Sequence, residues 1–210
     1  MSVPWQSAQG ARGLLLVSGD PARVAGWVRR GLVACQVVPL GRWSALLPAE
    51  PGSRAKPPYD DAVAVLAARP VPARLRPALG FYEVEDRAVV TVSPRGWRSG
   101  QRWLVWQPGT GVGRLQDLEP ARIADLVGAA GRTARPAEVS RVLGDPAGTV
   151  AQVLDNLMTA LDLPALDLWR GTVDHDRQGE VVEPTDRAVQ RFDARLAEEA
   201  RHRAEMEGQT

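Results

Sequence analysis

The sequence predicts an α+β protein with a ferredoxin-like, split-βαβ two-layer sandwich and two extra strands, followed by an α-helical C-terminal region. Short apolar runs and two segments of helical periodicity alternate in the order β-α-β-β-α-β, and two more strand-like runs follow. Past Gly113 the strand patterns stop and helical patterns replace them. The charge changes sign at the same place. Residues 1–116 hold 15 Lys and Arg against 7 Asp and Glu, and residues 117–210 hold 11 against 18.

These shifts divide the 210-residue chain into four parts. We expect a disordered N-terminus (1–12), a basic α+β domain (13–116), an acidic helical region (117–170), and a loop with a partly exposed C-terminal helix (171–210). The opposite charges of the two halves favour docking of one on the other. The alternative is that each half meets a different partner.

The first elements follow from local patterns. Apolar residues at 13–18 predict a buried strand. Asp20 and Pro21 then predict a helix start, because Asp caps free N–H groups and Pro at the first helical position needs no hydrogen bond. Two apolar runs, 34–38 and 43–47, flank a Pro-Leu-Gly turn and predict a pair of strands.

In the rest of the first half, prolines mark the loops that separate the predicted helix and strands. Four prolines make 48–58 a loop, a helix is expected over 59–69, and a proline-rich connector follows at 70–77. Strands are expected at 79–84, 87–93 and 101–107, the last two with alternating side chains.

Helices are expected throughout the second half. Apolar spacing predicts helices over 121–130 and 136–143, and Gly144-Asp145-Pro146 resembles a cap that opens a third, with its apolar stripe from Val150 to Leu161. An apolar cluster follows at 164–169, and 171–184 is expected to be loop. Thr185 caps a final helix whose apolar residues stop halfway along it.

Small residue counts exclude several classes of protein. One cysteine, Cys35, allows no internal disulfide, and two histidines, His175 and His202, leave little material for a metal centre. No window approaches the ~20 apolar residues of a membrane span, and the run at 14–17 is too short for a signal peptide. We therefore expect a cytoplasmic protein with no cofactor, no metal and no membrane contact.

An Arg/Trp stretch at 95–106 is the main candidate for partner contact. Five of its residues are the predicted partner-binding site: Trp97, Arg98, Arg102, Trp103 and Trp106. Trp and Arg dominate interface hot spots, and Arg interleaved with aromatic residues also suits single-stranded nucleic acid, with phosphates on Arg and bases stacked on rings. The alternative is structural, with the tryptophans packed under helices and the arginines at the rim.

Other polar patterns have structural explanations. Gly109–Gly113 lies between a strand and a helix but lacks the spacing of phosphate-binding loops, so we interpret it as a flexible boundary between the halves. Residues 174–176 (Asp-His-Asp), with Glu180 and Glu183, fit a solvated loop. Asp60 and Asp61 fit a helix N-terminus, where carboxylates are stabilised.

No motif identifies a family, and none points to a nucleophile or a catalytic acid–base pair. We therefore expect a non-enzymatic binding or adaptor protein with a protein partner. Two alternatives stay open: a single-stranded nucleic-acid binder that uses residues 95–106, and an enzyme whose site is assembled from distant residues.

Overall fold

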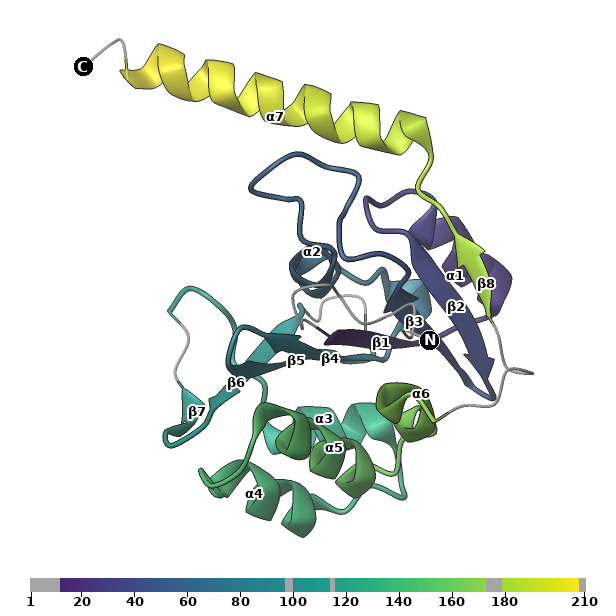
Figure 1. Cartoon of the computed structure of the whole chain (residues 1–210), viewed down its shortest axis with the longest axis vertical. Coiled ribbons are helices and arrows are strands. Elements are labelled where there is room, and N and C mark those ends of the chain that lie inside the picture. The colour runs from purple at the N-terminus through teal and green to yellow at the C-terminus, as the bar shows by residue number, and fades with distance from the viewer. Residues whose placement is uncertain (1–11, 97–99, 114–115, 173–178, 208–210) are drawn as a thin grey trace.

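A single eight-stranded sheet, antiparallel throughout and ordered β7-β6-β5-β4-β1-β3-β2-β8, lies in the middle of the computed structural model (Figure 1). The structure describes residues 12–96, 100–113, 116–172 and 179–207. The strands are β1 (Arg12–Ser18), β2 (Cys35–Leu40), β3 (Trp43–Pro48), β4 (Ala78–Val84), β5 (Arg87–Ser93), β6 (Arg102–Gln107), β7 (Gly111–Gly113) and β8 (Glu180–Val182). The helices are α1 (Pro21–Val28), α2 (Ala62–Ala68), the 3-10 turn η1 (Ala73–Leu75), α3 (Ile123–Ala130), α4 (Pro136–Gly144), α5 (Val150–Ala160), α6 (Leu166–Arg170) and α7 (Asp186–Glu207).

The coarse prediction of a mixed α+β protein is confirmed. The two-layer sandwich is a prediction for the first half of the chain alone, and the helical region adds a further layer. Helices α1 and α2 cover one face of the sheet, and α3 to α6 cover the other, so the molecule has three layers (Figure 1). The order of the eight strands is not a simple ferredoxin arrangement. The second helical layer forms because the first-half sheet is apolar on both faces, which a single layer of helices would leave half exposed.

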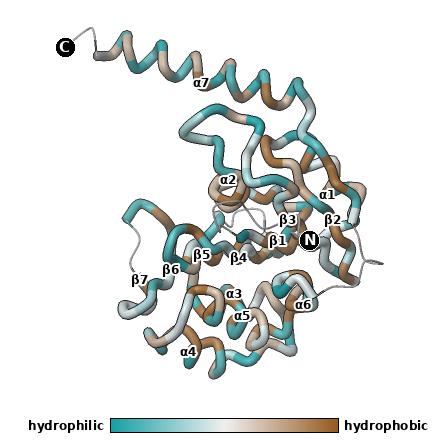
Figure 2. Tube along the Cα trace, viewed as in Figure 1, coloured by the Kyte–Doolittle hydropathy of each residue, from teal (hydrophilic) through white to brown (hydrophobic). Residues whose placement is uncertain are grey.

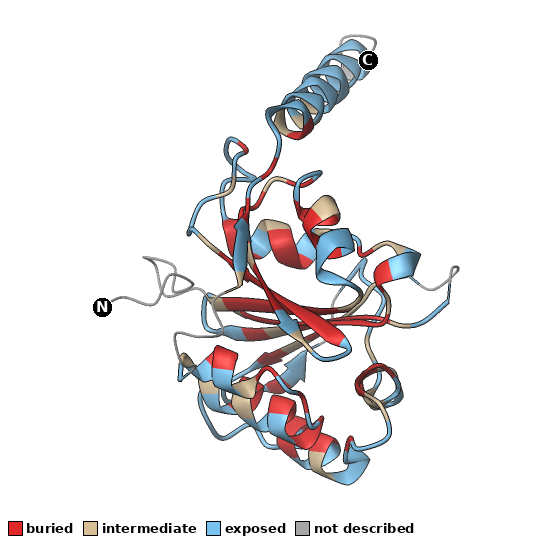
Figure 3. Cartoon of the chain, turned by 90° about the vertical axis from the view of Figure 1, so that its right-hand side faces the viewer, coloured by how far each residue is buried: buried red, intermediate tan, exposed pale blue. Residues whose placement is uncertain are grey.

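Each face of the sheet contributes to its own core, because side chains alternate along a strand. Leu14 and Leu16 of β1 lie in the core under α3 to α6, whereas Leu15 and Val17 lie in the core under α1 and α2. Buried residues follow the strands and the inward sides of the helices, and α7 is almost entirely exposed (Figure 3). Hydrophobic segments gather in the body of the molecule, while α7 is more hydrophilic (Figure 2).

Helix starts follow the capping chemistry, with one correction. Asp20 caps α1 as predicted, with Oδ1 accepting from the N–H of Ala22 at 2.9 Å. The prediction that Gly144-Asp145-Pro146 opens a helix is wrong. Asp145 accepts only from Ala147 in a local turn, and α5 begins after Thr149, whose side chain and Gln152 form a capping box.

Two segments have a different structure from the one predicted for them. Residues 180–182, expected to be loop, form β8 and pair with Cys35 to Val37 of β2. A three-residue strand carries too little pattern to be predicted, and its pairing with β2 is long-range. Gly109 lies in the β6–β7 hairpin turn and Gly111–Gly113 is strand β7, with Gly109 and Gly111 at positive φ. Predicted disorder at 1–12 falls largely outside the described residues, but Arg12 is the first residue of β1.

The acidic half docks on the basic half through apolar contacts with ion pairs at the edges. Residues of α3 to α6 share one core with the sheet. Arg102 of β6 contacts the carboxylates of Glu119 (2.9 Å) and Asp125, and Arg54 contacts Asp186 at 3.1 Å. Within the described residues, no helix is both long and apolar enough to cross a membrane.

Candidate functional site

The Arg/Trp stretch is not assembled into one exposed surface by the described residues. Trp106 is fully buried in the core under α3 to α6, and Trp103 is half-buried against the opposite core. The guanidinium of Arg102 is held by Glu119 and Asp125. Trp97 and Arg98 lie outside the described residues. Contact between this stretch and a partner stays a prediction.

The other polar candidates also have local structural roles. Asp61 caps α2, its Oδ1 accepting from Ala64 N–H at 2.6 Å. Burial raises the pKa of the Cys35 thiol to about 12, so the sulfur stays protonated at neutral pH. Residues 174–176 lie outside the described residues. Elsewhere in the described chain, no group of three or more His, Cys, Asp or Glu side chains is arranged to hold a metal ion.

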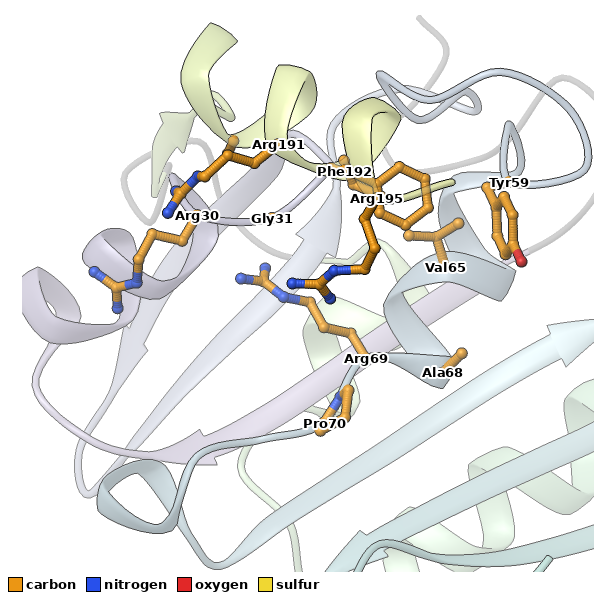
Figure 4. A pocket seen from close by; sticks show the side chains of 12 residues that line it. Arg30, Gly31, Tyr59, Val65, Ala68, Arg69, Pro70, Arg191, Phe192 and Arg195 are labelled. Carbon is orange, nitrogen blue, oxygen red and sulfur yellow. The ribbon is translucent and has the colours of Figure 1, made fainter. Parts of the chain in front are cut away.

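A cavity of about 510 Å³ lies between α7, the end of α2 and the loop that follows α1 (Figure 4). We call this cavity the arginine pocket, because four arginines line it: Arg30, Arg69, Arg191 and Arg195. Two come from the sheet-bound body and two from α7. The volume lies within the ~300–1,000 Å³ of small-molecule sites.

Arg69 is the most constrained of the four side chains. Its guanidinium lies 3.7 Å from the centre of the Trp27 ring and donates a hydrogen bond to the Trp27 carbonyl oxygen. A Cβ at Gly31 would lie 2.1 Å from Nη1 of Arg69, so glycine is what lets the guanidinium approach the backbone at this position. Arg69 is therefore pre-positioned at the floor of the pocket.

Positive charge gathers at the pocket, and no Asp or Glu is among the described residues that line it. Burial is the main cause that lowers the pKa of Arg69 to about 10, and the nearby charge of Arg30 lowers it further. The side chain is still protonated at neutral pH. Among the described residues, no carboxylate forms an ion pair with any of the four arginines, whereas Arg102, Arg135 and Arg170 each have at least one. Guanidinium groups brought together in this way are chemically suited to bind an anion.

Contacts at its first turns hold α7 over the pocket. The N–H and hydroxyl of Thr185 donate to the carbonyl oxygen of Arg29, at 2.9 and 3.1 Å. The rings of Tyr59 and Phe192 meet edge to face, with centroids 5.3 Å apart. With this register fixed, Arg191 and Arg195, one helical turn apart, both border the cavity.

A second cavity, of about 370 Å³, lies by the β2–β3 turn and is a weaker candidate. Its Arg42 already donates to the carbonyl oxygen of Ala130 and lies 5.0 Å from the centre of the Trp43 ring. Asp162 shares the lining and offsets the positive charge.

Sequence reasoning missed the arginine pocket because its residues come from segments more than 100 positions apart. One local indication existed: Arg191 and Arg195 are spaced i, i+4 and flank Phe192 on the half of the last helix that carries apolar residues. The convergence with Arg30 and Arg69 depends on the path of β8, which no local pattern predicts.

No protein-family model, curated protein or solved structure matches this chain. The function is therefore argued from the geometry of the pocket.

Proposed function

We propose that the protein is a non-enzymatic binding protein that holds an anionic ligand in the arginine pocket. The observation that carries this proposal is the convergence of four arginines on one cavity without a paired carboxylate among the described residues. Guanidinium groups bind phosphate and carboxylate through paired, charge-assisted hydrogen bonds. The preset position of Arg69 lowers the entropic cost of binding.

The lining favours binding over catalysis. Apart from the arginines, the residues of the described chain that border the cavity are apolar or aromatic, and none is Asp, Glu, His, Cys or Ser. General acid–base or nucleophilic chemistry needs such a group within hydrogen-bond reach of the reacting atoms. Among these lining residues, the hydroxyl of Tyr59 is the only group besides the arginines that could exchange a proton, so the pocket is better suited to orient and neutralise an anion.

The protein-adaptor interpretation and the nucleic-acid alternative remain proposals that use residues 95–106. The carboxylates already bound to Arg102 and the burial of Trp106 give these proposals less support than the arginine pocket has. A cytoplasmic location is also proposed, supported by the single unpaired cysteine.

We further infer that β1 to β4 with α1 and α2 are a ferredoxin-like unit that later strands extend. The partial order β4-β1-β3-β2, antiparallel at each step, and the shared face of the two helices support this inference. The pocket then lies on the helix-covered side of the unit, where the chain leaves α1 and α2.

Titration with pyrophosphate tests the binding proposal. Isothermal calorimetry at about 50 mM NaCl should show one site per chain, and the affinity should fall as salt rises because the contact is ionic. Arg30→Gln and Arg191→Gln should each weaken binding about tenfold or more, since each removes a charge-assisted hydrogen bond.

Matched controls lie on α1 and on α7. Arg23→Gln on α1 and Arg201→Gln on the outer half of α7 remove one exposed charge each without touching the cavity. Both should bind pyrophosphate as the unmodified protein does. Equal losses in controls and pocket variants would contradict the proposal, because they would show a response to net charge alone.

A further inference from the structure

We propose that the ligand of the arginine pocket is a nucleoside di- or triphosphate bound without a metal ion. This inference rests on the proposed anion-binding function and specifies its ligand. The cavity is divided along its length: Arg69 and Arg195 lie at its middle with Arg191 and Arg30 beyond them on one side, and Phe192, Tyr59 and Val65 lie at the other (Figure 4). A ligand that fills it therefore needs a strongly anionic end and an apolar, flat end.

The anionic end must carry more than one negative charge. Four arginines from three segments line the cavity, and none forms an ion pair with another described residue. A single carboxylate or phosphate monoester would leave part of this charge uncompensated. Two or three linked phosphates match it, and they can bridge Arg30 and Arg69 of the body to Arg191 and Arg195 of α7.

The flat end is indicated by the aromatic pair. Because Tyr59 and Phe192 meet at an interplanar angle of 88°, each ring keeps a face that its partner does not cover. Tyr59 is 41% exposed, so part of its ring is open to a ligand. A nucleobase presents such a face. Few polar groups border this side, so we expect little discrimination between bases.

The absence of acidic residues separates this site from nucleotide sites that need Mg²⁺. Magnesium is held at such sites by carboxylates together with phosphate oxygens. No Asp or Glu borders the cavity among the described residues. The arginines would supply the neutralising charge in place of the metal, so Mg²⁺ in solution competes with the protein for the phosphates.

Calorimetry with three probes in EDTA tests the inference: ADP, pyrophosphate and adenosine. We expect ADP to bind about tenfold more tightly than pyrophosphate, because the base adds a stacking contact. Adenosine alone should not bind measurably. Replacing EDTA with excess Mg²⁺ should weaken ADP binding several-fold.

Variants at the aromatic side separate stacking from general packing. Phe192→Leu keeps an apolar side chain but removes the ring, and it should bring the affinity for ADP close to that for pyrophosphate. Phe192→Tyr should restore the preference. Pyrophosphate should bind both variants like the unmodified protein, which shows that α7 is still in place.

The outcomes distinguish the two proposals. If ADP and pyrophosphate bind equally, or if Mg²⁺ strengthens ADP binding, the nucleotide inference is overturned and the anion-binding function stands. If neither ADP nor pyrophosphate binds, both proposals are overturned. If Phe192→Leu weakens ADP and pyrophosphate alike, the ring acts only as a support for α7, and the stacking contact is rejected.

Discussion

At the scale of single residues, Arg69 and Cys35 are both removed from solvent to a large extent, but their surroundings suit them to different roles. Arg69 is half-buried, yet Trp27 holds it through both its ring and its carbonyl oxygen, and Gly31 leaves room for it. Cys35 is also buried, and its Sγ donates one hydrogen bond to the carbonyl oxygen of Val33, at 3.6 Å. The contacts of Arg69 therefore place its charge beside the cavity. The thiol of Cys35, in contrast, is buried among apolar side chains.

The burial of Cys35 predicts a stability loss at alkaline pH. Its pKa is raised to about 12 in the folded state, whereas the unfolded thiol ionises near 9, so between these values the folded state holds more protons. The free energy of unfolding therefore falls as pH rises above about 9, by at most ~1.4 kcal/mol per pH unit for one group. Urea unfolding at pH 8, 9 and 10 measures this fall in the free energy of unfolding.

Cys35→Ala provides the control for this prediction. Burial also raises the pKa of Tyr82, which adds a loss of the same sign, so the variant should keep part of the pH dependence. Its slope between pH 9 and 10 should be smaller than that of the unmodified protein. Identical slopes would show that Cys35 is accessible to water in the folded state.

At the scale of elements, boundaries set by adjacent residues could be predicted and those set by distant ones could not. Asp20 with Pro21 located the start of α1, and Thr185 the start of α7, because capping acts within three residues. The edge strand β8 and the arginine pocket depend on pairing between β2 and a segment about 145 positions later. The cap assigned to Asp145 was wrong because two capping sequences compete within five residues.

The corrected start of α5 predicts unequal effects for two alanine substitutions. Thr149→Ala removes the side-chain acceptor for Gln152 N–H and should lower the free energy of unfolding by about 1 kcal/mol. Asp145→Ala removes only the local turn to Ala147 and should cost less than half as much. Urea unfolding at neutral pH compares them. Equal losses would mean that Asp145 also stabilises the helix.

At the scale of the whole molecule, the opposite charges of the two halves are not what holds them together. The second helical layer shares a continuous apolar core with the sheet, built from residues such as Leu14, Phe81, Leu126 and Leu157. Ion pairs that link the halves lie at the edges, and those of Arg29 and Arg54 have largely exposed side chains. Exposed pairs contribute about 0–1 kcal/mol each and are screened by salt.

Salt should therefore affect folding and ligand binding differently. Raising NaCl to 1 M shortens the screening length to about 3 Å, yet the free energy of urea unfolding should change by less than about 1 kcal/mol, because the apolar core is unaffected. Pyrophosphate affinity should fall steeply over the same range, since the arginine pocket attracts its ligand through charge. A stability loss of several kcal/mol would contradict this view and would show that charge docks the acidic half.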